Sequence, residues 1–188
     1  MESGQTPSII PWQMSILKVA RMGHPALRTK ARPLAPREIR SDVFQKLVDD
    51  MIETMVEYHG VGLAAPQVHE SLRLFVASPP AENESSEPEP MVIINPEITQ
   101  VGSEIVEDWE GCLSIPDIRG RVPRPREIKL RALDRSGERI ELQLRGLPAR
   151  VILHENDHLD GVLFFDRMRS FETLTFLDEY ARYWGRDD

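Results

Sequence analysis

The sequence predicts an α+β fold in a single domain. Its 188 residues fall within the usual size of one domain, and at this length roughly 70% of the unfolded chain's surface can be buried. A long amphipathic helical pattern occupies the first third of the chain, and strand patterns dominate the middle. A second helical pattern follows them, so helices and strands are segregated along the chain rather than alternating.

The N-terminal part predicts one short strand and one amphipathic helix. We expect residues 1–14 to be a flexible extension and residues 16–19 to form a short strand. Ser41 has the chemistry of a helix N-cap. After it, apolar residues recur with a 3.6-residue period over about four turns, and the pattern ends at His59-Gly60. These apolar positions are Val43, Phe44, Leu47, Val48, Met51, Ile52, Met55 and Val56.

The middle of the chain predicts strands and one mobile loop. Residues 79–90 are almost entirely Pro, Glu, Ser, Asn and Ala, a composition that buries little apolar surface and predicts a mobile acidic loop. Asp134 to Gly137 has the composition of a hairpin turn. The strand patterns cover residues 72–77, 91–94, 98–107, 128–133 and 139–144.

Two more helices are expected near the C-terminus. Gly146-Leu147-Pro148 has the composition of a helix start, and Asp160-Gly161 that of a helix end. A third helix is expected from about Ser170 to Trp184, within a C-terminal segment that covers residues 170–188. This segment has more acidic than basic residues, so we do not expect a basic RNA-binding tail. We expect its aromatic and aliphatic side chains to pack on the domain or on a partner subunit.

Overall charge and composition narrow the function. The net charge of −8 disfavours binding to DNA. The basic residues between 119 and 131 are interrupted by prolines, which favours a solvated edge or a carboxylate-binding role. No apolar run approaches the ~20 residues of a membrane helix, and residues 1–14 lack the features of an export signal. The single cysteine excludes an internal disulfide, and together these features predict a cytoplasmic protein.

Residues 154–158 read His-Glu-Asn-Asp-His. If they are helical, His154 and His158 lie one turn apart on one face, with Glu155 beside them. Two such histidines can bind a divalent metal, and the carboxylate can move a proton to or from a water molecule that the metal activates. We therefore interpret this segment as part of a hydrolytic metal site.

A third metal ligand must come from another segment, because no further His or Glu follows at the spacing of a metalloprotease. Cys112, in Glu-Gly-Cys-Leu-Ser at residues 110–114, is the residue we expect. A lone cysteine is usually a small buried apolar residue, but two histidines that lack a partner reverse that expectation. The glycine-rich segment 60–67 can approach a substrate closely, and Gln67 can donate to an oxyanion.

These three segments together resemble the peptide deformylase family. The resemblance rests on GVGLAAPQ at 60–67, EGCLS at 110–114 and HENDHLDG at 154–161, in the family's order, and covers about residues 15–168. It implies mixed, largely antiparallel strands packed around a central helix that carries the HExxH motif, with a C-terminal helix. It also implies removal of the formyl group from the N-terminal formyl-methionine of nascent polypeptides.

The resemblance also implies roles for individual residues. Cys112, His154 and His158 would hold the metal, natively Fe(II), with Ni(II), Co(II) or Zn(II) able to substitute. Glu155 would be the general base and then the acid, and Gln67 with the backbone N–H of Leu113 would stabilise the oxyanion. Substrate would be bound by Gly62 and by a methionine pocket formed by Val61, Leu147 and Val151.

Three further residues have expected structural roles, and two positions depart from the family pattern. Asp157 and Glu110 are interpreted as structural partners of the ligands and of arginines, with Arg124 as one such arginine. Leu153 replaces a Gln that is usual in the family, and His59 stands where an acidic residue is common in some members.

Two alternative functions remain open, a HExxH metallopeptidase and a non-catalytic metal-binding module. The expected partners are formyl-methionyl peptides, and transient association with the ribosome stays open.

Overall fold

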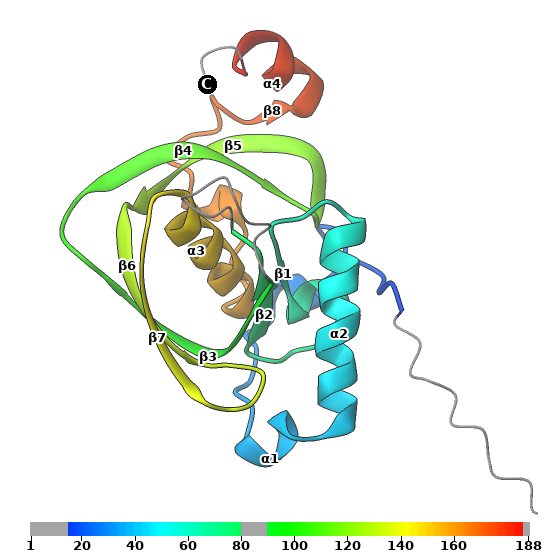
Figure 1. The fold of residues 1–188 in the computed structure, drawn as a ribbon. Helices are drawn as coiled ribbons and strands as arrows, with labels where there is room; N and C mark the ends of the chain where they lie inside the picture. Colours follow the sequence, from blue (N-terminus) through cyan, green and yellow to red (C-terminus); the bar gives the residue numbers. More distant parts are fainter. Residues whose placement is uncertain (1–14, 80–89, 186–188) are drawn as a thin grey trace, which may run out of the picture.

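The computed structural model describes residues 15–79 and 90–185. The expected N-terminal extension, and the acidic loop apart from its two end residues, lie outside the described residues. Two β-sheets enclose a central helix, α3 (Leu147–Leu159), and a second long helix, α2 (Asp42–Glu57), packs outside them (Figure 1). The predicted α+β class, with strands around the histidine-bearing helix, is confirmed.

The larger sheet has five antiparallel strands in the order β1-β2-β3-β6-β7. A bulge between Ile94 and Glu97 interrupts β3. There Asn95 adopts a left-handed φ of 51°, and its side chain both donates to and accepts from the backbone of Leu34. The strands are β1 (Gly62–Ala64), β2 (Leu74–Ala77), β3 (Met91–Gln100), β6 (Glu127–Leu133) and β7 (Arg139–Arg145).

The smaller sheet has the order β4-β5-β8, and two of its strands, β5 and β8, were not predicted. Its strands are β4 (Ile105–Cys112), β5 (Ile115–Pro125) and the short β8 (Thr175–Phe176). The basic segment, expected as a solvated edge, forms much of β5. Its prolines are tolerated because β8 pairs only with Ile118 and Arg119, so Pro123 and Pro125 have a strand partner on one side only.

The helices begin and end where local chemistry stabilises their termini. At the start of α2, the Ser41 hydroxyl accepts a hydrogen bond from the backbone N–H of Phe44. The predicted hairpin between β6 and β7 is confirmed, and the Asp134 carboxylate accepts from the backbone N–H groups of Ser136 and Glu138. The remaining helices are α1 (Pro36–Ile39), α4 (Leu177–Tyr183) and the 3₁₀ helices η1 (Pro25–Arg28), η2 (Ala65–Val68) and η3 (Phe164–Arg167).

Three expected elements differ in the structure. Residues 16–19 are not a strand, because the backbone N–H of Leu17 donates to the Thr54 hydroxyl rather than to a neighbouring strand. The predicted strand 98–107 is divided by a turn in which Gly102 has a φ of +69°. The C-terminal helix begins only at Leu177, because the residues before it form a turn and then pair with β5.

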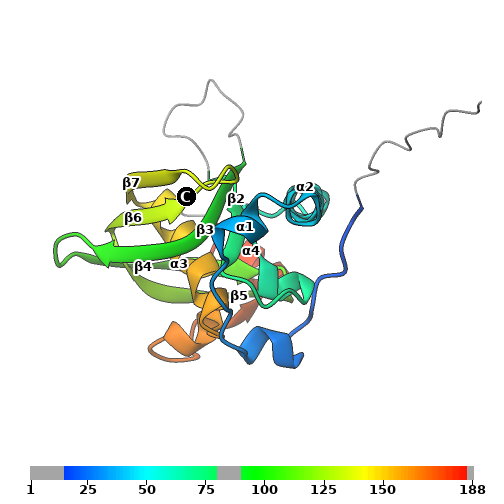
Figure 2. The same cartoon turned by 90° about the horizontal axis from the view of Figure 1, so that it is seen from below.

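Apolar side chains pack on both faces of the larger sheet where β1, β2 and β3 lie. α2 packs one face through Val48, Met51 and Met55, all of which are at most 1% exposed. α3 packs the opposite side through Ala149, Ile152 and Leu159. Figure 2 shows α3 between the layer of β3, β6 and β7 and the layer of β5, with α2 outside. The histidine-bearing helix is therefore held from several sides.

No helix in the described ranges has the length and apolar composition needed to cross a bilayer.

The exposure pattern of α2 gives a test of the core. Met51→Ala should lower the free energy of unfolding by about 2–5 kcal/mol, because it leaves a cavity where a fully buried side chain was. Val43→Ala in the same helix should cost at most about 0.5 kcal/mol, since Val43 is 81% exposed. Urea unfolding monitored by circular dichroism measures both. Equal losses in the two variants would contradict this packing.

Candidate metal centre

The helix α3 brings its two histidines to one face at the centre of the molecule. Gly146, with a φ of +64°, precedes the helix. Gly161 follows it with a φ of +72°, and a Cβ there would lie 2.8 Å from the backbone carbonyl carbon of Arg28. His158 is 1% exposed and His154 is 9% exposed. The ring centroids of these two imidazoles are 5.1 Å apart, as the helical spacing predicts.

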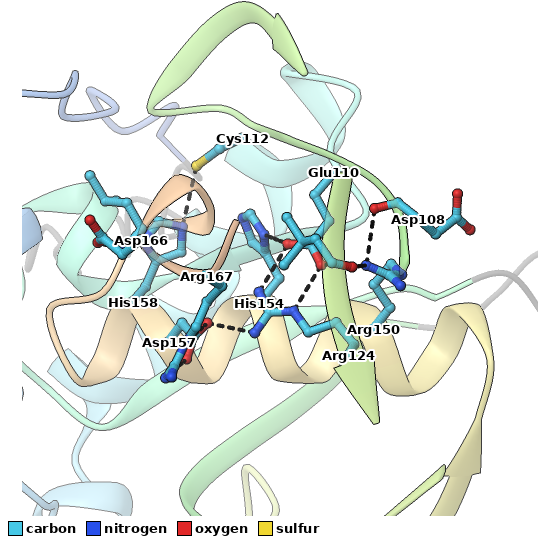
Figure 3. Close-up of polar contacts among 12 residues, drawn as sticks. Asp108, Glu110, Cys112, Arg124, Arg150, His154, Asp157, His158, Asp166 and Arg167 are labelled. Carbon is cyan, nitrogen blue, oxygen red and sulfur yellow. Dashed lines mark hydrogen bonds and ion pairs between the residues drawn. The ribbon is translucent and has the colours of Figure 1, made fainter. Parts of the chain in front are cut away.

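Cys112 reaches these histidines from the other sheet. It ends β4 at a register shift after Gly111, where the chain turns into β5. Its Sγ lies 3.3 Å from Nε2 of His158 (Figure 3). One ligand atom from each of Cys112, His154 and His158 lies within 4.8 Å of the others. The structure therefore brings together the three residues expected to bind a metal.

The protonation state of the thiol suits metal binding. Burial raises the pKa of Cys112, but the adjacent His158 and His154 lower it by more, so the pKa lies well below that of a free thiol. The thiolate is the form of cysteine that binds metals. A thiolate with two imidazoles is a ligand set for transition metals such as iron, nickel, cobalt or zinc. The residues present therefore fit a mononuclear metal site.

A buried network of ion pairs orients the ligands. The Glu110 carboxylate accepts from Nδ1 of His154 at 2.9 Å, which leaves Nε2 of that ring directed away from the carboxylate. It also accepts two hydrogen bonds from Arg124, at 2.8 and 2.9 Å, and one from Arg150 at 2.8 Å (Figure 3). Burial raises the pKa of Glu110, but the hydrogen bonds and charges of Arg124 and His154 outweigh it and lower the pKa to about 2.

The network extends to the other end of α3 through Asp157. Its carboxylate accepts from Arg124 at 2.6 Å and from Arg167 at 2.7 Å. The interpretation of Glu110, Asp157 and Arg124 as structural partners agrees with these contacts. Arg150 and Arg167 were missed. Arg150 lies four residues before His154, so helical spacing would have placed both on one face, whereas no sequence pattern indicates Arg167.

Glu155 lies beside the metal ligands with one oxygen available. It is 4% exposed, and its Oε2 is buried without a hydrogen-bond partner in the described structure. Burial raises the pKa of Glu155 to about 7, against the opposing effect of His154 and His158. A Cβ on Gly62 would lie 2.4 Å from Oε1 of Glu155. Only glycine at position 62 lets β1 approach the carboxylate this closely.

Gln67 is fixed next to the thiol. Its Oε1 accepts from the backbone N–H of Ala64 at 2.8 Å, which orients the amide. Its Nε2 then donates to Ser114 Oγ at 3.2 Å and lies 3.6 Å from Cys112 Sγ. Gln67 is 1% exposed. Its side-chain donor is thus held at the site, with Ser114 as a partner that the sequence analysis did not identify.

A cavity of about 790 Å³ opens onto this site. Its wall includes the sequence-predicted residues Val61, Gly62, Gln67, Cys112, Leu113, Leu147, Val151, His154 and Glu155. His158, which is 1% exposed, is the one predicted site residue that does not line it. Val61 and Leu147 are about half exposed, whereas Val151 is buried. The volume suits a peptide segment of a few residues.

This fold and site define a class of protein. A thiolate and two imidazoles converge beside a buried carboxylate and open onto a cavity that contains an oriented amide donor. This arrangement is that of a mononuclear metal hydrolase, which activates water for attack on a carbonyl group.

Comparisons with known proteins identify the family. Residues 16–173 match the sequence model of the polypeptide deformylase family. The chain is 43% identical over 168 residues to peptide deformylase 2 of a Nostoc strain, covering 88% of this chain and 93% of the relative. It is 46% identical over 163 residues to a peptide deformylase of Salinibacter ruber, covering 83% and 82%.

Solved structures agree. A class I type b peptide deformylase from Acinetobacter baumannii, with Met-Ala-Ser bound, superposes with a TM-score of 0.77 at 39% identity and covers 83% of this chain and 100% of that one. The peptide deformylase from Thermotoga maritima gives a TM-score of 0.74 at 40% identity, with coverage of 82% and 99%.

The chain belongs to the polypeptide deformylase family. It is an enzyme of that family, whose members are metal-dependent hydrolases that remove the formyl group from the N-terminal formyl-methionine of polypeptides. This assignment favours the deformylase interpretation over the two alternatives, a HExxH metallopeptidase and a non-catalytic metal-binding module.

The buried network gives a second test. Glu110→Gln should lower the free energy of unfolding by about 3–5 kcal/mol, because Arg124 and Arg150 lose the charge that compensates their burial. It should also weaken metal affinity by roughly 10–100-fold, because His154 loses its orienting partner.

Denaturation and metal titration of the same variant measure these effects. The matched control is Glu104→Gln, which removes an exposed partner of Arg126 and should cost no more than about 1 kcal/mol. If Glu110→Gln behaved like this control, the network would not orient the site.

Proposed function

We propose that this chain removes the formyl group from N-terminal formyl-methionyl peptides and releases formate, with one divalent metal held by Cys112, His154 and His158. The observation that carries the proposal is the convergence of one sulfur and two imidazoles within 4.8 Å, beside Glu155 and at the cavity. Cys112 comes from β4 and both histidines from α3, so their convergence is not a property of one helix.

The metal we propose is Fe(II), with Ni(II), Co(II) or Zn(II) as substitutes. A site with one thiolate and two imidazoles suits all four ions. Such an ion, when bound, supplies Lewis acidity at the formyl group and at the attacking water. Three protein ligands leave a coordination position for those groups, as catalytic metal sites require.

Glu155 is the proposed general base and acid. It is next in sequence to His154, is buried, and has Oε2 without a partner in the described structure. We assign it the proton of the attacking water, which it then delivers to the departing amine. General acid–base catalysis of this kind typically contributes about 10²–10⁴-fold.

Gln67 and Leu113 are the proposed oxyanion donors. The bond from Ala64 N–H to Gln67 Oε1 directs the Nε2 donor toward Cys112, where negative charge would develop on the formyl oxygen. Leu113 follows Cys112 and lines the cavity, so its backbone N–H is assigned the second donor. Each such donor typically contributes about 2.7–4 kcal/mol to stabilisation of the transition state.

The substrate would lie along β1 with its methionine in the cavity. Gly62 lets a peptide main chain approach Glu155, because any larger residue would meet that carboxylate. Val61, Leu147 and Val151 are the apolar residues assigned to the methionine side chain, and all three line the cavity.

We place this reaction in the cytoplasm, on nascent chains. Transient contact with the ribosome remains part of the proposal but is not assigned to α4. That helix carries Asp178 and Glu179 in its first turn and only Arg182 near its end, which is unsuited to binding an RNA backbone.

The role of Glu155 can be tested by an isosteric substitution. Glu155→Gln should retain the metal but lower kcat at least about 100-fold, because the amide cannot move the proton. Formate release from a formyl-Met peptide, with metal analysis of the same sample, measures both. The control Glu57→Gln, on the exposed end of α2, should be unchanged. Near-normal turnover by Glu155→Gln would refute the assigned role.

The ligand set can be tested through metal content alone. Cys112→Ala should lower metal affinity by more than the roughly 10–100-fold that loss of an outer partner costs, since a directly bonded sulfur is removed. Elemental analysis after anaerobic purification and dialysis measures it. His24→Ala, which removes an imidazole outside the metal-binding cluster, should keep its metal. An unchanged metal content in Cys112→Ala would show that the ligand is misassigned.

A further inference from the structure

The C-terminal segment contributes one residue, Leu177, to the cavity wall. β8 pairs with β5 at Ile118↔Phe176 and Arg119↔Thr175. Just before it, the Thr173 hydroxyl accepts from the backbone N–H of Arg121 at 3.1 Å. α4 follows at once, and its first residue, Leu177, lines the cavity. Residues to which the proposed chemistry gives no role are thus part of the substrate-facing surface.

Aromatic contacts fix α4 against the smaller sheet. The Trp109 ring lies 4.9 Å from the Tyr180 ring and 5.7 Å from the Trp184 ring, measured between centroids. Trp109 belongs to β4, three residues before Cys112, and also lines the cavity. The position of α4 is therefore tied to the strand that supplies the metal-binding sulfur.

Arg119 is held at this wall by two independent contacts. It is paired with Gly111 across β4 and β5, and its Cγ lies 3.6 Å from the position that a Cβ on Gly111 would occupy. Its guanidinium carbon lies 5.3 Å from the centroid of the Tyr180 ring, a cation–π distance. The side chain thus packs over Gly111, the residue before Cys112, and its guanidinium lies against the Tyr180 ring of α4.

The Arg119 guanidinium has no carboxylate partner in the described ranges, although it lines the cavity. The buried Arg150 in the same wall is already bonded to Glu110. Apart from Glu155 and the Glu110–Arg150 pair, the other Asp, Glu, Lys and Arg side chains that line the cavity are Arg21 and Asp117. Both are exposed, and neither forms an ion pair within the described residues. Outside the buried network, two cations, Arg119 and Arg21, and one anion, Asp117, therefore line the cavity with Glu155.

We propose that Arg119, positioned by Tyr180, binds a carboxylate of the peptide substrate beyond its first residue. The inference rests on the proposed function, which places the formyl end of the peptide at the metal and sends the rest of the chain out along this wall. A guanidinium presents a planar fork of N–H donors that matches a carboxylate. The carboxylate belongs to an acidic side chain at the second or third residue, or to the C-terminus of a short peptide.

Isosteric peptide pairs test this selectivity and distinguish the sources of the carboxylate. The metal-loaded enzyme is assayed with formyl-Met-Glu-Ala-NH₂ against formyl-Met-Gln-Ala-NH₂, formyl-Met-Ala-Glu-NH₂ against formyl-Met-Ala-Gln-NH₂, and formyl-Met-Ala-Ala against its amide. We expect kcat/KM to favour the carboxylate in at least one pair by about fivefold, equivalent to about 1 kcal/mol. The preference should arise from KM and disappear in about 0.5 M salt, where screening is strong.

Variants assign the preference to Arg119. Arg119→Gln should bring the ratio to about one, and Tyr180→Leu should lower it, whereas Tyr180→Phe keeps the ring and should preserve it. The control Arg145→Gln makes the same charge change on β7, outside the cavity wall, and should leave both ratio and turnover unchanged. A wild-type ratio of one in all pairs, or a preference that survives Arg119→Gln, would overturn the proposal.

A binding measurement separates this proposal from the proposed function. Calorimetry with the unformylated peptides Met-Ala-Glu-NH₂ and Met-Ala-Gln-NH₂, and with the corresponding second-residue and free-carboxylate pairs, detects the same preference without turnover. Absence of formate release from every peptide would reject the proposed function, and equal binding within every pair would then reject the role of Arg119 as well. Release from all peptides without any preference would reject the role of Arg119 alone.

Discussion

The buried carboxylate of Glu110 is the group on which the arrangement of the site depends. It belongs to β4, yet its partners are Arg124 on β5 and Arg150 and His154 on α3. Removing a carboxylate from water costs several kcal/mol, so this position is tolerable only while all these donors are in place. The same contacts therefore fix the helix relative to the hairpin and set the orientation of the His154 imidazole, one of the proposed metal ligands.

Close packing of the main chain then brings the remaining groups to the metal ligands. β1 runs past Glu155 with only a hydrogen atom at Gly62 between them, and a Cβ on Gly60 would lie 2.9 Å from Cδ1 of Leu113. The glycines of this segment are thus required by neighbours that lie far away in sequence. The amide of Gln67 is placed by the same segment, through its bond to Ala64. The packing of this backbone segment therefore sets the positions of the groups assigned to catalysis.

The sequence predicted those features that a local pattern encodes. The 3.6-residue period of α2, the turn chemistry after β6 and the histidine spacing on α3 each depend on a few neighbouring residues. β5 was missed because Pro123 and Pro125 oppose a strand locally, and only the limited pairing with β8 makes them acceptable. Residues 16–19 resemble a strand, but the backbone N–H of Leu17 donates to the Thr54 hydroxyl on α2. The partnership of Arg167 with Asp157 depends on a turn after α3 that no periodicity describes.

The three proposed metal ligands come from two different layers of the molecule. Cys112 ends a strand of the smaller sheet, whereas both histidines lie on the helix enclosed between the sheets, and the chain between Cys112 and His158 includes β5, β6 and β7. An ion bound by all three therefore acts as a cross-link that closes a long loop, and it binds tightly only after both layers have assembled. Cofactor supply and conformational stability are consequently coupled, so that metal starvation would leave a chain more easily unfolded and degraded.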